Sequence, residues 1–234
     1  MSSVLDPVLW VIYPYIALTI FIVGLVLRFD RDPYVWTSKS SEILEKRWLG
    51  IGSLMFHWGF LFVFIGHIMG LLIPAPFYES IGITFKTYHI ISFYGGAIAG
   101  LIATAGVVIL LLRRILIKKV RATSDAGDFF TLTLLLVIFV SGLANTIGYD
   151  VVVGPYDYRK TIGVWVRGLI LFHPQYQVMA TVPITFQIHV LLGLLFFAAL
   201  PFTRLVHIFS LPIPYLWRRY IVYRTIGEQE VIES

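Results

Sequence analysis

Two long apolar segments of the sequence each carry a pair of histidines. Segment 52–70, GSLMFHWGFLFVFIGHIMG, holds His57 and His67, and segment 183–210, PITFQIHVLLGLLFFAALPFTRLVHIFS, holds His189 and His207. A titratable ring is unfavourable inside a long apolar run, so each histidine needs a partner in the interior of the bundle. The pattern predicts that the two segments pack together and that their histidines form two pairs.

The composition indicates a membrane protein. Hydrophobic residues make up 58% of the 234 residues and charged residues only 13%, whereas about a quarter of the residues of a soluble domain are charged. Five apolar runs approach or exceed the ~20 residues that cross the hydrocarbon layer. They cover residues 8–27, 50–73, 89–112, 128–147 and 183–210. We therefore predict an all-α, multi-pass protein in the cell membrane: one integral membrane domain over residues 1–234, built as a bundle of five transmembrane helices, with a polar tail at 217–234.

The basic residues are concentrated in alternate connections. The side that holds most of them comprises Arg28, Arg31, Lys39, Lys46, Arg47, Arg113, Arg114, Lys118, Lys119, Arg121, Arg204, Arg218, Arg219 and Arg224. The other side has Lys86, Arg159, Lys160 and Arg167. Because basic connections remain in the cytoplasm, we expect the N-terminus outside and the C-terminus in the cytoplasm. The net charge of +5 follows from this topology, so it requires no nucleic-acid partner.

This orientation gives each histidine a depth in the membrane. His67 and His189 fall toward the outer face, and His57 and His207 toward the cytoplasmic face. At ~1.5 Å per residue, the histidines are ~15 Å apart on one helix and ~27 Å apart on the other. The mean of ~21 Å fits two planar macrocycles stacked in a ~30 Å core.

Two facing imidazoles can hold the iron of haem b without covalent attachment. Filling both axial positions with protein leaves no site for a small ligand and favours electron transfer. The chain has no cysteine, which excludes thiolate metal sites, cysteine-ligated iron–sulfur clusters and the C-x-x-C-H attachment of c-type haem. We therefore predict two haem b groups between the second and fifth helices, with axial pairs His67–His189 and His57–His207.

A different class of protein could use the same histidines as a proton relay or as hydrogen-bonded interior groups. Such a transporter or channel would usually show internal repeats or broken helices at the midplane. The sequence shows neither, apart from Pro201, which is expected to kink the fifth helix between its two histidines.

The sequence resembles the gamma subunit, the di-haem cytochrome b membrane anchor, of respiratory nitrate reductases. The resemblance extends over most of the chain. Its blocks are YPYIA from Tyr13, LFVFIGHIMG from Leu61, RRILIKKVRATSDAGD from Arg113, IHVLLG from Ile188 and PFTRLVHIFSLPIPYL up to Leu216. In this family four histidines bind two b haems, and the matching positions are the four named above.

The resemblance implies a quinol dehydrogenase module. Quinol would be oxidised near the outer haem, and electrons would pass through the inner haem to an iron–sulfur (beta) subunit on the cytoplasmic face. Nitrate would be reduced at the molybdenum centre of a catalytic (alpha) subunit, because this chain has no residues for that chemistry. Related di-haem anchors serve heterodisulfide-reductase-like and sulfite-reductase-associated complexes, and this sequence alone leaves the choice of complex open.

Further residues are candidates for binding quinol and haem. Lys86 matches a lysine that the family uses near the quinol, although an interfacial lysine can also extend to the lipid headgroups. Gly66, directly before His67, would let a ring approach closely, so the quinol candidates are Lys86, Gly66 and His67. The candidates for the haem propionates are Arg113, Arg114 and Arg204, because arginine suits carboxylate geometry; positive-inside bias alone also predicts arginines there.

Two expectations concern packing. Gly52, Gly59 and Gly66 recur every seven residues, which fits a small-residue seam between helices as well as clearance for haem. Within the long connection 148–182, the stretch GVWVRGLILF is apolar with one arginine, and we expect it to form an amphipathic segment at the membrane interface, over the outer haem.

Overall fold

The computed structural model describes residues 5–31 and 42–209, and all structural statements concern these two ranges. They are helical throughout their regular parts and contain no strand. Five helices are long and apolar enough to cross a membrane: Leu5–Arg31, Arg47–Leu72, Phe85–Leu116, Ala126–Val152 and Ile184–Phe202. The prediction of an all-α protein with five helices that could span a membrane is confirmed for the described residues.

Several of these spans contain more than one helical element. The first joins α1 (Leu5–Pro7), η1 (Val8–Ile12) and α2 (Tyr13–Arg31), and the second and third are α3 (Arg47–Leu72) and α5 (Phe85–Leu116). The fourth joins α7 (Ala126–Leu143), the π-helical η2 (Ala144–Tyr149) and α8 (Asp150–Val152). The fifth consists of α10 (Ile184–Ala199) and the 3-10 turn η5 (Leu200–Phe202).

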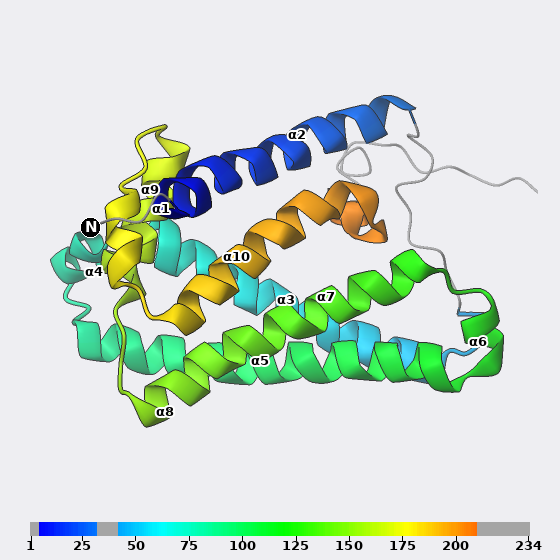
Figure 1. The fold of residues 1–234 in the computed structure, drawn as a ribbon. Helices are drawn as coiled ribbons and strands as arrows, with labels where there is room; N and C mark the ends of the chain where they lie inside the picture. The colour runs from blue at the N-terminus through cyan, green and yellow to red at the C-terminus, as the bar shows by residue number, and fades with distance from the viewer. Residues whose placement is uncertain (1–4, 32–41, 210–234) are drawn as a thin grey trace, which may run out of the picture.

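The long helices lie lengthwise in one bundle, in the spatial order α3, α5, α7, α10 and α2 (Figure 1). Short elements close its two ends. One end, called here the α9 end, carries α4 (Ala75–Ser80), α8, η3 (Tyr158–Lys160), α9 (Ile162–Ile170) and η4 (Tyr176–Thr181). The opposite end, the α6 end, carries α6 (Lys118–Ala122) and η6 (Arg204–Phe209).

Small residues bring α3 and α5 into close contact. A Cβ atom on Gly59 would lie 2.5 Å from the backbone nitrogen of Ala103, and one on Gly106 would lie 2.5 Å from that of Phe56. A Cβ atom on Gly52 would meet Leu110 at 3.0 Å, whereas one on Gly66 would meet nothing within 4 Å. Two of the three regularly spaced glycines therefore belong to a helix-packing seam, and Gly66 faces open space.

The fifth span is broken rather than kinked. α10 ends at Ala199, Pro201 lies in a 3-10 turn, Thr203 is extended, and His207 follows on η6. Proline ends the helix because it donates no hydrogen bond and its ring clashes with the preceding turn. The guanidinium of Arg28 on α2 donates to the carbonyl oxygens of Pro201 (2.5 Å) and Thr203 (2.8 Å). The spacing of ~27 Å derived from a continuous helix is therefore wrong for this segment.

The connection 148–182 folds onto the α9 end. The GVWVRGLILF stretch lies largely in a helix, α9, whose buried residues include Ile162, Trp165 and Leu169. Trp165 is 1% exposed and donates through its indole nitrogen to the Trp10 carbonyl oxygen at 2.8 Å. Residues three or four apart share one face of a helix, so this apolar face docks α9 on the first span.

Replacing Gly59 with alanine should force α3 and α5 apart. We expect the free energy of unfolding to fall by about 1–3 kcal/mol, the usual effect of overpacking, because the new methyl group meets backbone rather than a flexible side chain. Thermal unfolding of the purified protein in detergent measures this. The matched control is Gly50→Ala, since a Cβ atom there meets nothing within 4 Å; equal melting temperatures for the two variants would contradict the seam.

Candidate functional site

The structure brings the four histidines together as two pairs. The rings of His67 on α3 and His189 on α10 have centroids 6.0 Å apart, with an angle of 38° between their planes. The rings of His57 on α3 and His207 on η6 have centroids 6.1 Å apart, with an angle of 58°. These partners are those expected from the sequence, and the second pair lies nearer the α6 end.

Hydrogen bonds to Nδ1 fix the tautomer of three of these rings. The Nδ1 atom of His57 lies 2.7 Å from the Ser53 carbonyl oxygen, that of His67 lies 2.8 Å from Val63, and that of His207 lies 2.7 Å from Arg204. A carbonyl oxygen only accepts, so Nδ1 carries the proton and Nε2 is the nitrogen with the lone pair. Metal-bound histidines usually donate their other N–H in this way.

The separations fit a metal ion held between two imidazoles. With metal–nitrogen bonds of about 2 Å, two rings on opposite sides of one ion have centroids about 6 Å apart. Among the described residues, no group of three or more His, Cys, Asp or Glu side chains could hold a metal ion. Two imidazoles are the ligands that a haem iron would take from the protein.

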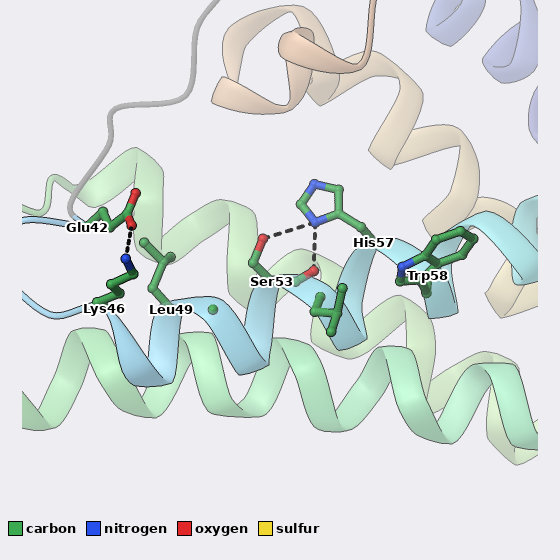
Figure 2. A pocket seen from close by; sticks show the side chains of 8 residues that line it. Glu42, Lys46, Leu49, Ser53, His57 and Trp58 are labelled. Carbon is green, nitrogen blue, oxygen red and sulfur yellow. Dashed lines mark hydrogen bonds and ion pairs between the residues drawn. The ribbon is translucent and has the colours of Figure 1, made fainter.

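A pocket of about 510 Å³ follows α3 beside His57 (Figure 2). The residues lining it are Glu42, Lys46, Leu49, Gly50, Ser53, Leu54, His57 and Trp58. Figure 2 shows the His57 ring projecting from α3 with its Nδ1 atom turned back toward Ser53. Sequence reasoning missed this pocket. It also missed the contact between Ser53 and His57, although their spacing of four residues places both on one face of the helix.

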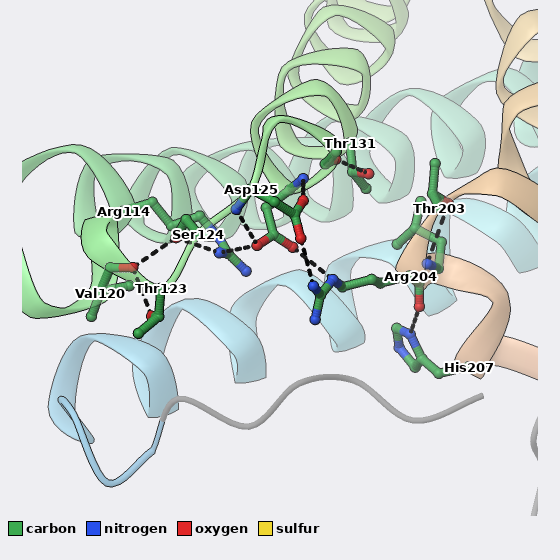
Figure 3. Close-up of polar contacts among 12 residues, drawn as sticks. Arg114, Val120, Thr123, Ser124, Asp125, Thr131, Thr203, Arg204 and His207 are labelled. Carbon is green, nitrogen blue, oxygen red and sulfur yellow. Dashed lines mark hydrogen bonds and ion pairs between the residues drawn. The ribbon is translucent and has the colours of Figure 1, made fainter. Parts of the chain in front are cut away.

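The three arginines proposed for the propionates all bind carboxylates of this chain. Arg113 is 2% exposed and bonds Glu45 through Nε at 2.7 Å. Figure 3 shows the network around the other two. Arg114 Nη1 lies 2.8 Å from Asp128 Oδ2, and Arg204 bridges Asp125 (2.6 Å) and Asp128 (3.0 Å).

Arg204 is the only one of these arginines that is adjacent to a paired histidine. Its carbonyl oxygen accepts from His207, and its guanidinium remains 34% exposed. The Arg204 guanidinium and the backbone N–H of Asp128 hold the pKa of Asp125 below its ordinary value. The acidic partners of Arg204 were not identified from the sequence, because Asp125 precedes Arg204 by 79 positions.

The quinol candidates lie toward the α9 end. Lys86 is exposed in the first turn of α5, and Gly66 faces open space beside His67. No hydrogen bond or ion pair joins these residues to one another within the described ranges. His89, one turn beyond Lys86, places Nε2 3.2 Å from Asp150 Oδ1 and so links α5 to α8.

A buried polar cluster that sequence reasoning missed holds the C-terminal end of α3. The side chain of Arg159 binds both oxygens of Asp157, at 2.7 and 3.0 Å, and lies 4.0 Å over the Tyr88 ring. Burial raises the pKa of the Tyr158 phenol, whose hydroxyl bonds that of Tyr88 at 3.1 Å. Arg167 donates to the Leu71 carbonyl oxygen at 2.8 Å. A cation there compensates the negative end of the helix dipole.

Fold and site together define an all-helical, multi-pass membrane protein with two facing histidine pairs, one toward each end of the bundle. A family model described as "Nitrate reductase gamma subunit" matches residues 6–226. The chain belongs to this family.

Three relatives illustrate the breadth of the similarity. The nitrate reductase gamma chain of Bacillus subtilis (strain 168) is 48% identical over 93% of this chain and 97% of its own length. The respiratory nitrate reductase 1 gamma chain of Escherichia coli (strain K12) is 34% identical over 91% of this chain and 94% of its own. The Hdr-like menaquinol oxidoreductase cytochrome b-like subunit of Archaeoglobus fulgidus is 27% identical over 84% and 75%.

Replacing Asp128 with asparagine should destabilise the α6 end, because the Asp128 side chain is 3% exposed and compensates both Arg114 and Arg204. We expect a loss of about 3 kcal/mol, typical of breaking a buried ion pair, measured by thermal unfolding in detergent. Asp125→Asn is the control: its side chain is 55% exposed, and asparagine caps a helix as well as aspartate does. A smaller loss for Asp128→Asn than for Asp125→Asn would contradict this account.

Proposed function

We propose that this chain is the quinol-oxidising cytochrome b subunit of a respiratory nitrate reductase. In this proposal it binds two haem b groups, one through His67 and His189 and one through His57 and His207. The observation that carries the proposal is the matched geometry of the two pairs, with ring centroids 6.0 and 6.1 Å apart. Membership of the nitrate reductase gamma subunit family supports it.

Haem bound at these sites would supply a one-electron carrier. The chain's own residues would hold each haem between two imidazoles, which would leave no place for a small ligand and would favour electron transfer. The bundle also keeps the pairs apart, with both α3 histidines on one rigid helix. Two carriers at different depths provide a route across the bilayer that neither could provide alone.

The proposed orientation places the α9 end outside and the α6 end in the cytoplasm. Arg113, Arg114, Lys118 and Lys119 lie at or beside the α6 end, which agrees with the positive-inside rule. On this basis the first described residues would be outside, and the haems would be held between α3 and the segment α10–η6. Residues 1–234 would form one membrane domain in the cell membrane. The tail at 217–234 lies outside the described residues.

Electrons would leave at the α6 end. We propose that an iron–sulfur (beta) subunit docks there, beside His57 and His207, and passes electrons to a molybdenum-containing catalytic (alpha) subunit. The α6 end is the appropriate face because it is the one next to the inner haem. The chain itself then acts as the quinol dehydrogenase part of the complex and reduces no nitrate.

Quinol would bind near the outer haem, at Lys86, Gly66 and His67. Lys86 offers an exposed cation for a quinol oxygen, and the open space at Gly66 lets a planar ring approach. Protons released on oxidation would leave on the outer side. The A. fulgidus relative is a menaquinol oxidoreductase subunit, which supports quinol as the substrate class.

For the haem propionates we propose Arg204 as the principal partner at the inner haem. It is partly exposed and lies three residues before His207. All three arginines bind carboxylates of this chain, but Arg113 and Arg114 are less exposed than Arg204, at 2% and 22%. They remain candidates that would also hold the helix ends around the inner haem.

A second candidate keeps the chemistry and changes the complex. Because the A. fulgidus relative belongs to an Hdr-like menaquinol oxidoreductase, the same di-haem module could deliver electrons to a heterodisulfide-reductase-like partner. The two gamma chains are more similar to this chain than that relative is, at 48% and 34% identity against 27%, which favours nitrate reductase.

Haem quantitation on the purified chain tests the central proposal. We expect two b haems in the reduced-minus-oxidised spectrum, with His67→Ala removing the outer haem and His207→Ala the inner one. His173→Ala is the control, because His173 is exposed in a connection and should leave both. A protein without haem would refute the proposal, and two variants that lose the same haem would refute the pairing.

Replacing Lys86 with alanine should weaken quinol binding with both haems retained. We expect the KM for a quinol analogue to rise about tenfold, which corresponds to ~1.4 kcal/mol, close to the lower limit for a hydrogen bond to a charged group. Lys160→Ala is the matched control, because Lys160 is also an exposed lysine at the α9 end and lies 3.9 Å from Glu79. Equal KM values for the two variants would exclude Lys86 from the quinol site.

A further inference from the structure

The four paired histidines are not held in the same way. Three of them donate Nδ1–H to a carbonyl oxygen three or four residues earlier in their own segment. His189 is the exception, because its Nδ1 atom lies 2.8 Å from the hydroxyl oxygen of Ser141 on α7. The orientation of this one ring therefore depends on a side chain from a different helix.

We propose that Ser141 is a positioning residue for His189 and thereby sets the reduction potential of the outer haem. The inference rests on the proposed function, since it assumes that His189 binds haem iron. It concerns a residue that neither the sequence pattern nor the family resemblance singled out.

The hydrogen bonds assign the direction of the contact. Ser141 Oγ lies 2.8 Å from the Ile138 carbonyl oxygen as well as 2.8 Å from His189 Nδ1. A hydroxyl has one proton, and a carbonyl can only accept, so that proton goes to Ile138 and the serine oxygen accepts from His189. His189 therefore carries its proton on Nδ1, and Nε2 is left as the nitrogen for the iron.

The residues around Ser141 complete a seat for the ring. A Cβ atom on Gly142 would lie 3.1 Å from His189 Cε1, so the residue after Ser141 leaves space into which the imidazole fits. One turn further, Asn145 Nδ2 donates to the Thr185 carbonyl oxygen at 3.3 Å, one turn before His189 on α10. The segment 141–145 thus fixes both the ring and the turn of helix that carries it.

This contact affects the iron through the ligand. An acceptor on Nδ1–H makes the imidazole a better electron donor, and a more strongly donating axial ligand stabilises oxidised iron and lowers its potential. Removing the Ser141 hydroxyl should therefore raise the potential of the outer haem. The inner haem should not respond, because its ligands bond to carbonyl oxygens of their own segments.

The test compares three variants of the full-length chain purified with its haems. Redox titration followed at the haem absorbance gives the two midpoint potentials, and electron paramagnetic resonance of the ferric protein gives the two low-spin signals. For Ser141→Ala we expect a higher potential and an altered signal for the outer haem alone. Ser141→Thr keeps the hydroxyl and should retain the wild-type values.

Ser53→Ala is the matched control. Ser53 Oγ also lies near a ring nitrogen, 3.2 Å from His57 Nδ1, but the Ser53 carbonyl oxygen lies closer, at 2.7 Å. Removing this hydroxyl leaves the acceptor of His57 in place, so both potentials should be unchanged. An inner-haem shift in Ser53→Ala as large as the outer shift in Ser141→Ala would overturn the distinction between the sites.

Other outcomes also decide the proposal. Wild-type potential and signal in Ser141→Ala would overturn it. Loss of the outer haem in Ser141→Ala but not in Ser141→Thr would support a positioning role for the hydroxyl, whereas loss in both would show that only the shape of residue 141 matters. A wild-type chain without haem would refute the proposed function itself, and this is known before any variant is compared.

Discussion

A polar group within the span of a bilayer has no water to bond to, so it must find its partner inside the protein. This constraint accounts for several polar contacts of the bundle. The histidine rings donate to carbonyl oxygens or to Ser141. Arg28 binds the carbonyl oxygens exposed where the fifth span breaks, and Asp128 is shared by two arginines. The contacts of Arg28 and Asp128 also hold the segment that carries Arg204 and His207.

α3 is the element on which both histidine pairs depend. Its middle is held against α5 by glycine and alanine contacts at Gly59 and Ala103. Its C-terminal end is held by Arg167 at Leu71, and its N-terminal end by Glu45, which accepts from the backbone N–H of Trp48 and from Arg113. Because α3 is held at three places, the distance between His57 and His67 is set by the geometry of this one helix. The packing of α10 and η6 then places His189 and His207 next to the two α3 histidines.

The sequence was sufficient to predict the five spans and the partners that face each other. Apolar length, basic residues in alternate connections and histidine depth depend only on local pattern, and the bilayer imposes that pattern directly. The haem ligation, the orientation and the quinol site stay predictions.

The break after Ala199 could not be predicted, since proline in a helix produces either a kink or an end. In this structure the helix ends there, and Arg28 binds the carbonyl oxygen of Pro201. The Ser141 contact joins residues 48 positions apart, and no periodicity predicts which serine of one helix meets which histidine of another.

The two pairs are built by different means, and the difference follows from where the chain breaks. His207 lies beyond the break, on a 3-10 segment held by the Asp125–Asp128–Arg204 network, so its position depends on ion pairs at the end of the bundle. His189 lies within a regular helix, where backbone geometry is fixed, and adjustment is left to the side chain that its ring meets. A site at the bundle end can respond to whatever binds that end, because its supporting charges are partly exposed. The His67–His189 pair lies within the bundle, so its geometry depends on how α3, α7 and α10 pack against one another.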